Sequence, residues 1–157
     1  MNETRVDVAI PTSMPTSSKI LCAVYAVIAL AALLATWSQN LAYLHSVADL
    51  TTFVGTFVTD TKVTPASRSI TVDILLLFLA AAIFMVIEAR KHDVKFVWAY
   101  LIGGALIAIS VTFPLFMIAR ELRICRTDPT RLKPADVVVL ALFAVGLAWL
   151  VVWIDVA

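Results

Sequence analysis

Two acidic residues beside an apolar segment are the first candidates for chemistry. Asp73 lies in the first turn of the apolar run Ile70–Ile87, and Glu88 directly follows that run. A charged side chain within a membrane-spanning segment costs free energy. Such residues are therefore often functional: they transfer protons, bind ions or contact substrates. The two carboxylates are about 15 residues apart, or roughly 22 Å along a helix. They therefore cannot form one general acid and base pair within a molecule.

Each of these acids has a functional and a structural interpretation. Asp73 is either a proton or cation site, the catalytic carboxylate of an enzyme acting on a lipid or isoprenoid, or an acid that interacts with its own helix dipole or with Arg68. Glu88 is either such a functional acid or the partner of Lys91 or Arg120 in an ion pair at the membrane edge. The residue types alone favour the structural interpretation of both.

Other polar residues in the second half of the chain could line a path or contact lipid. Ser110 and Thr112, together with Asp73, would line a polar path in an oligomeric transporter or channel. Three arginines spaced three residues apart share one helix face and are candidate contacts for lipid headgroups, or signals of membrane topology: Arg120, Arg123 and Arg126.

The sequence contains no constellation typical of a cofactor or of nucleophilic catalysis. The two histidines, His45 and His92, fall in different loops, and no Cys/His cluster has the spacing of a zinc or haem site. Neither a phosphate-binding glycine loop nor a nucleophile elbow is present. We therefore predict no catalytic, cofactor-binding or metal-binding residue, and we favour a non-enzymatic protein over an enzyme. The net charge of +1 argues against a nucleic-acid partner.

The composition is that of an integral membrane protein. Of 157 residues, 62% are hydrophobic and 15% charged, against roughly 45–50% and about 25% in soluble domains. The mean hydropathy is +0.98. Apolar runs of membrane-spanning length begin after a flexible polar tail, residues 1–19, and make residues 20–157 one domain. They are Ile20–Trp37, Ile70–Ile87, Phe96–Ile118 and Val137–Ile154.

These runs predict an all-α, antiparallel bundle of four transmembrane helices. In the first loop, apolar residues recur at helical spacing from Val47 to Val58, which predicts a short interfacial helix. Pro114 is expected to kink the third helix, because proline removes a backbone donor. Gly103 and Gly104 offer a small-residue face for helix packing, either within the chain or against another protein.

Four straight spans would place both termini on one side of the membrane. The tail and second loop carry five basic residues: Arg5, Lys19, Arg90, Lys91 and Lys95. The first and third loops carry seven: Lys62, Arg68, Arg120, Arg123, Arg126, Arg131 and Lys133. The positive-inside rule then predicts that both termini lie outside the cell. The same topology separates Cys22 from Cys125 by the membrane, which excludes a disulfide between them.

Several spaced motifs from Trp37 to about Ile124 carry a family resemblance. In chain order they are Ser38-Gln39, Asp73-Ile74-Leu75, Glu88-Ala-Arg-Lys-His92, Trp98-Ala-Tyr100, Ser110-Val-Thr-Phe-Pro-Leu-Phe116 and Arg120-Glu121. In these the chain resembles a bacterial membrane-protein family known as domain of unknown function two-eight-three-four. The resemblance implies a small membrane protein of three or four helices. It brings no activity, cofactor or functional residue, and the fourth run lies outside it.

Three functions remain, from different classes. The small size and missing catalytic constellation favour an accessory or scaffolding subunit of a larger bacterial envelope complex in the inner (plasma) membrane, with lipids and a protein partner or second copy as its contacts. The alternatives are an oligomeric small transporter or channel and a membrane enzyme acting on a lipid or isoprenoid. The enzyme is disfavoured because Asp73 and Glu88 fall at opposite membrane faces.

Overall fold

The computed structural model describes residues 14–46, 49–125 and 132–156, and the elements within these ranges are helices. In chain order they are α1 (Thr16–Ser46), α2 (Leu50–Asp60), α3 (Pro65–His92), α4 (Val97–Gly103), the π-helical segment η1 (Gly104–Ala108), α5 (Ile109–Ile124) and α6 (Pro134–Val156). Most of the predicted polar tail lies outside the described residues, and α1 begins at Thr16, before the predicted start at Ile20.

The predicted fold class is confirmed. Four helical stretches are long and apolar enough to cross a membrane: Thr16–Leu41, Pro65–His92, Val97–Ile124 and Pro134–Ile154. Their side chains are mostly exposed, although many are large and apolar. In water such exposure would be unfavourable, whereas lipid tails accept it at no cost. The chain is therefore a multi-pass membrane protein.

Local sequence explains where the second of these stretches begins and ends. Thr64 caps the start of α3 by accepting a hydrogen bond from the Ser67 backbone N–H (3.0 Å), and the Ser67 hydroxyl accepts one from the Thr64 N–H (3.1 Å). This reciprocal pair is a capping box, and Pro65 fits the first helical turn because its missing N–H has no partner there. Asp93 ends the helix in the left-handed conformation (φ 51°).

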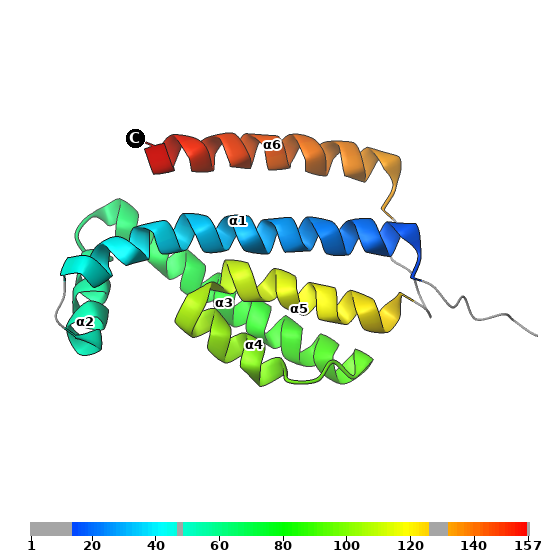
Figure 1. The fold of residues 1–157 in the computed structure, drawn as a ribbon, viewed down its shortest axis with the longest axis horizontal. Coiled ribbons are helices and arrows are strands. Elements are labelled where there is room, and N and C mark those ends of the chain that lie inside the picture. Colours follow the sequence, from blue (N-terminus) through cyan, green and yellow to red (C-terminus); the bar gives the residue numbers. More distant parts are fainter. Residues whose placement is uncertain (1–13, 47–48, 126–131, 157) are drawn as a thin grey trace, which may run out of the picture.

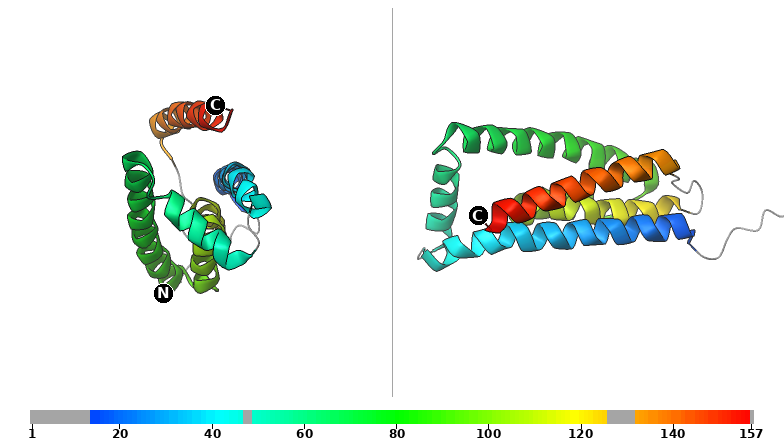
Figure 2. Two further views of the ribbon diagram at one scale, coloured as in Figure 1. Left: turned by 90° about the vertical axis from the view of Figure 1, so that its left-hand side faces the viewer. Right: turned by 90° about the horizontal axis from the view of Figure 1, so that it is seen from above.

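A short helix occupies the first loop, as the spacing from Val47 to Val58 predicts. Helix α2 runs crosswise over one end of the bundle, between α1 and α3 (Figure 2). Asp49 caps it by accepting hydrogen bonds from the Thr51 hydroxyl (2.6 Å) and the Thr52 N–H (2.8 Å). These bonds favour the charged carboxylate and hold the pKa of Asp49 below its usual value. A position at the membrane interface stays a prediction.

The third stretch folds back on itself, which hydropathy did not indicate. Helix α4 and η1 run toward the α2 end of the bundle, and α5 returns (Figure 1). The change of direction lies at Ala108, whose backbone is extended (φ 179°, ψ 141°). The predicted bend at Pro114 is not where the chain turns: Pro114 is buried inside α5, where losing one backbone donor leaves the helix continuous.

Specific contacts join the two limbs of this hairpin. The rings of Tyr100 and Phe116 meet edge to face, with centroids 5.8 Å apart. Nearer the turn, Gly104 faces Thr112 so closely that a Cβ atom on the glycine would lie 3.0 Å from the Thr112 hydroxyl oxygen. The pairs 100–116 and 104–112 share one antiparallel register. The limbs therefore pack directly on each other along their length.

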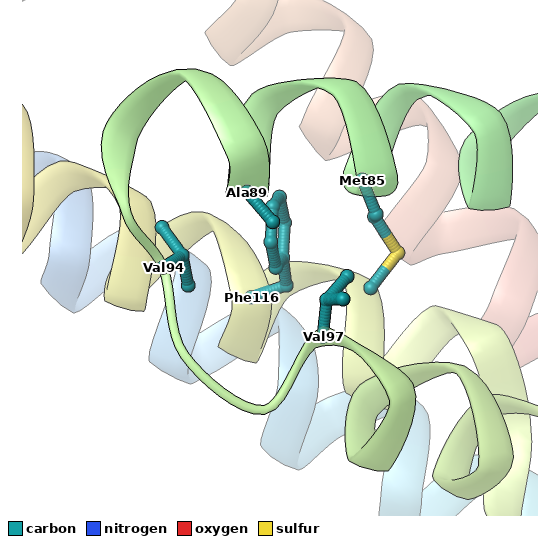
Figure 3. Packing of buried hydrophobic residues seen from close by; sticks show 5 residues of the cluster. All are labelled: Met85, Ala89, Val94, Val97 and Phe116. Carbon is teal, nitrogen blue, oxygen red and sulfur yellow. The ribbon is translucent and has the colours of Figure 1, made fainter.

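The core of the bundle lies where the hairpin meets the end of α3. Figure 3 shows Phe116 between Met85 and Ala89 of α3 on one side and Val94 and Val97 of the following turn on the other. Met85 and Phe116 have no exposed surface. Helix α1 packs along α5 and buries Ala29 there. The hairpin is thus held from both sides, by α3 and by α1.

The hairpin brings four helix ends together. Helices α3 and α5 end where α1 and α6 begin, and we name this the Glu88 end (Figure 1). The opposite end, crossed by α2, is the α2 end. The prediction that both termini lie on one side assumed a straight third span, so it does not follow from this arrangement.

Candidate functional site

A charged cluster at the Glu88 end is the best candidate for a functional site. The Glu88 carboxylate on α3 accepts a hydrogen bond from the Arg120 guanidinium Nε on α5. His92, one turn after Glu88, places its Nε2 3.4 Å from the same carboxylate oxygen. The side chains are 11% exposed for Glu88, 20% for Arg120 and 21% for His92. Glu88 is thus nearly buried. It faces the permanently charged guanidinium of Arg120 and the imidazole of His92, which is charged only when protonated.

This ion pair decides between the two partners proposed for Glu88. Arg120 forms the pair, while Lys91 acts on the carboxylate only through its charge. If the third apolar stretch were straight, Arg120 would lie at the membrane face opposite to Glu88. Contact with Glu88 therefore depends on the fold-back at Ala108. Arginine suits the position because its planar guanidinium stays charged when partly buried.

A second acid, Glu121, lies beside the pair and was not among the predicted candidates. It is only 1% exposed, and it faces helix α1. Its charge reaches Cys22 and Tyr25 on that helix. The sequence does contain a signal: Glu121 precedes the apolar Ile124 by three residues, so the two share a helix face, and Ile124 is buried in the structure. The adjacent arginines suggested an outward-facing segment instead.

The two cysteines lie at the same end of the bundle, contrary to prediction. Cys22, near the start of α1, lies close enough to Cys125, just after α5, for a charge on one thiol to affect the other. Both thiols are free. The prediction that they lie on opposite sides was wrong because it assumed that the third stretch crosses the membrane once.

The residues of the predicted polar path differ in their exposure. Asp73 is exposed in the third turn of α3, near the α2 end. Ser110 is exposed at the start of α5, whereas Thr112 is buried and its hydroxyl donates to the Ala108 carbonyl (3.5 Å). Because the path was predicted for an oligomer, it stays a prediction.

The candidate packing and lipid residues take different roles. Gly103 and Gly104 both face Thr112 within the hairpin, so their small size serves packing within the chain. Arg120 is engaged by Glu88, while Arg123 is exposed on the next turn. Arg126 lies outside the described residues. The predicted arginine face is thus divided between an internal ion pair and the surface.

The described residues offer little else for a ligand. They include no group of three or more His, Cys, Asp or Glu side chains that could hold a metal. A shallow, open pocket of about 310 Å³ lies where α2 meets α3. Its lining is Phe57, Asp60, Thr61, Ser67, Ile70 and Thr71. Its lining combines polar and apolar side chains, and it is open, unlike the enclosed pockets that bind small molecules.

The family comparison covers most of this architecture. The model of a protein family of unknown function, DUF2834, matches residues 24–122. The chain belongs to the DUF2834 family. The match begins within α1 and ends two residues after Arg120, so it includes α2, α3 and nearly all of the hairpin. Neither a curated protein nor a solved structure matches the chain.

The boundaries of the match separate two parts of this DUF2834 protein. Glu88, Arg120 and the hairpin turn at Ala108 fall within the family region. Helix α6 lies beyond it. The charged cluster therefore lies within the part of the chain that the family model matches, and α6 lies outside that part.

Proposed function

We propose that this DUF2834 protein is a non-catalytic accessory or scaffolding subunit of a larger complex in the bacterial inner membrane. One observation carries the proposal. Helix α6 lies along the outside of the bundle (Figures 1 and 2). Every described side chain from residue 132 to 154 is exposed. Each of the other three apolar stretches contains buried residues among those described.

An unpacked transmembrane helix is suited to binding another protein. Helices in a bilayer associate through van der Waals packing and interhelical hydrogen bonds, because lipid provides no hydrophobic driving force between them. The first three apolar stretches satisfy part of this packing within the chain, whereas α6 does not. A small domain with one free helix can join a neighbouring subunit through that helix and keep its own core intact.

The charged residues support a structural rather than catalytic role. Glu88 is held by Arg120, and Asp73 lies toward the other end of the same helix. A lipid-processing enzyme would need acids that converge on one substrate, and these two do not. The transporter alternative would need Asp73 and Thr112 on a shared path, yet Thr112 packs inside the hairpin.

Photocrosslinking in native membranes tests the proposal. A benzophenone side chain replaces either Phe143 or Trp149 on α6, both of which are well exposed. Leu76 on α3, similarly exposed, is the matched control position. We expect one protein to be crosslinked in high yield from α6 and little from Leu76. Adducts with lipid alone, together with a monomer after purification in mild detergent, would reject an accessory role.

A further inference from the structure

Charge is distributed unequally between the two ends of the bundle. Among the described residues, six exposed basic side chains lie at the Glu88 end: Lys19, Arg90, Lys91, Lys95, Arg123 and Lys133. Two exposed acids accompany them, Asp93 and Asp136. The α2 end has two exposed basic residues, Lys62 and Arg68, and three exposed acids, Asp49, Asp60 and Asp73. The Glu88 end is therefore positive, and the α2 end is slightly negative.

The hairpin creates this asymmetry. A straight third span would carry Arg123 to the α2 end, where it would balance the basic residues of the second loop. Because α5 returns, Arg123 joins Lys95 at one end. The positive-inside rule then favours the Glu88 end as the cytoplasmic end, so α1 begins in the cytoplasm. This reverses the orientation of α1 and α3 expected for four straight spans, whereas α6 still runs from the cytoplasm outward.

The turn between α3 and α4 exposes a basic and an aromatic side chain between two buried ones. Val94 and Val97 are buried against Phe116, which ties the turn to the core (Figure 3). Between them, Lys95 and Phe96 are exposed, and Phe96 is 79% exposed. Phe96 has a positive φ of 60°, which is uncommon for a bulky residue and costs free energy. The strained turn thus holds a basic and an aromatic side chain outward.

We propose that the Glu88 end binds the headgroups of anionic phospholipids in the cytoplasmic leaflet, with Lys95 and Arg123 as principal contacts and Phe96 as the aromatic anchor. Aromatic side chains favour the level of the headgroups, and basic residues there are attracted to anionic lipid. Arg120 is not counted among the principal contacts, because its side chain is only 20% exposed and its guanidinium pairs with Glu88. The lipid site lies on the surface around the ion pair and is independent of the partner proposed for α6.

Two matched double variants test this proposal. The full chain is placed in nanodiscs of equimolar phosphatidylglycerol and phosphatidylcholine, and the lipids that stay bound are counted by native mass spectrometry. Each basic residue contributes about a fivefold factor near an anionic surface. We therefore expect Lys95→Gln/Arg123→Gln to retain at least about tenfold less phosphatidylglycerol than the parent. Lys62→Gln/Arg68→Gln removes the same charges at the α2 end and should lose clearly less phosphatidylglycerol, because three exposed acids at that end already offset its two basic residues.

Three outcomes would overturn the proposal: no preference of the parent for phosphatidylglycerol, retention unchanged in Lys95→Gln/Arg123→Gln, or an equal loss in both variants. The orientation is measured separately, in a chain with Cys22 and Cys125 changed to serine. An impermeant maleimide should label Lys62→Cys in intact cells and should leave Lys95→Cys unlabelled until the cells are opened. Labelling of Lys95→Cys in intact cells would place the basic end outside and contradict the assignment to the cytoplasmic leaflet.

Discussion

Arg120→Gln is expected to lower the free energy of unfolding by about 3 kcal/mol, near the low end of the range for breaking a buried ion pair. The loss is large because the carboxylate of Glu88, 11% exposed, would keep its charge without the guanidinium that it faces. Partial exposure of Arg120 allows some water to reach the site, which limits the loss. Unfolding in mixed micelles of increasing denaturing-detergent content provides the measurement.

Two further variants separate the ion pair from general effects of charge. Arg123→Gln removes the same charge one turn later from an exposed site and should change stability by less than about 0.5 kcal/mol. In the double variant Glu88→Gln/Arg120→Gln, no buried charge remains unpaired. Its loss should therefore be smaller than the sum of the two single losses. Strict additivity would show that Glu88 and Arg120 do not interact.

Gly104→Leu should lower the free energy of unfolding by about 2 kcal/mol or more, since overpacking a buried site typically costs about 1–3 kcal/mol and occasionally more. A Cβ atom at position 104 would lie 3.0 Å from the Thr112 hydroxyl oxygen, 3.1 Å from Phe78 and 3.3 Å from Ile109. These neighbours come from both α3 and α5, so a larger side chain would separate the hairpin limbs from each other and from α3. The same detergent titration reports the effect.

Gly146→Leu is the matched control for this substitution. Gly146 lies on α6, and a Cβ atom there has no neighbour within 4 Å in the described structure. Leucine is also the better helix former, so stability should stay the same or rise slightly. Equal destabilisation by both substitutions would mean that position 104 is not a close contact, and the packing of the hairpin would have to be reconsidered.

Hydropathy and spacing predicted the helices well, because both depend on local sequence. The four apolar stretches and the short helix after Asp49 follow from run length and from a 3.6-residue period. The turn at Ala108 could not be found in this way. No proline or charged residue lies at that position, and the turn depends on Gly104 meeting Thr112 eight residues later. Pro114, the strongest local signal, lies inside a continuous helix.

The candidate site was predicted only in part, for the same reason. The sequence offered Arg120 as one partner for Glu88, since opposite charges at segment ends often pair. A straight third span, however, would hold the two residues apart. Glu121 was missed because its position beside α1 depends on the returning limb. Residue types thus indicated an ion pair. Which residues form the charged cluster, however, depends on the path of the chain in three dimensions.

The central claim is that the third apolar stretch returns to the end where it begins, and crosslinking positions 88 and 120 tests it most directly. The variant Glu88→Cys/Arg120→Cys is prepared in a chain with Cys22 and Cys125 changed to serine and is treated in native membranes with a short bismaleimide, which bridges the gap that the two shorter side chains leave. The pair Ala89→Cys/Val94→Cys is the control, because the Val94 N–H donates to the Ala89 carbonyl (3.0 Å) at the end of α3 whether or not the stretch folds back. A hairpin predicts an intrachain crosslink in both pairs. In a straight helix, residue 120 lies roughly 35 Å from residue 97, so a crosslink in the control pair alone would contradict the hairpin.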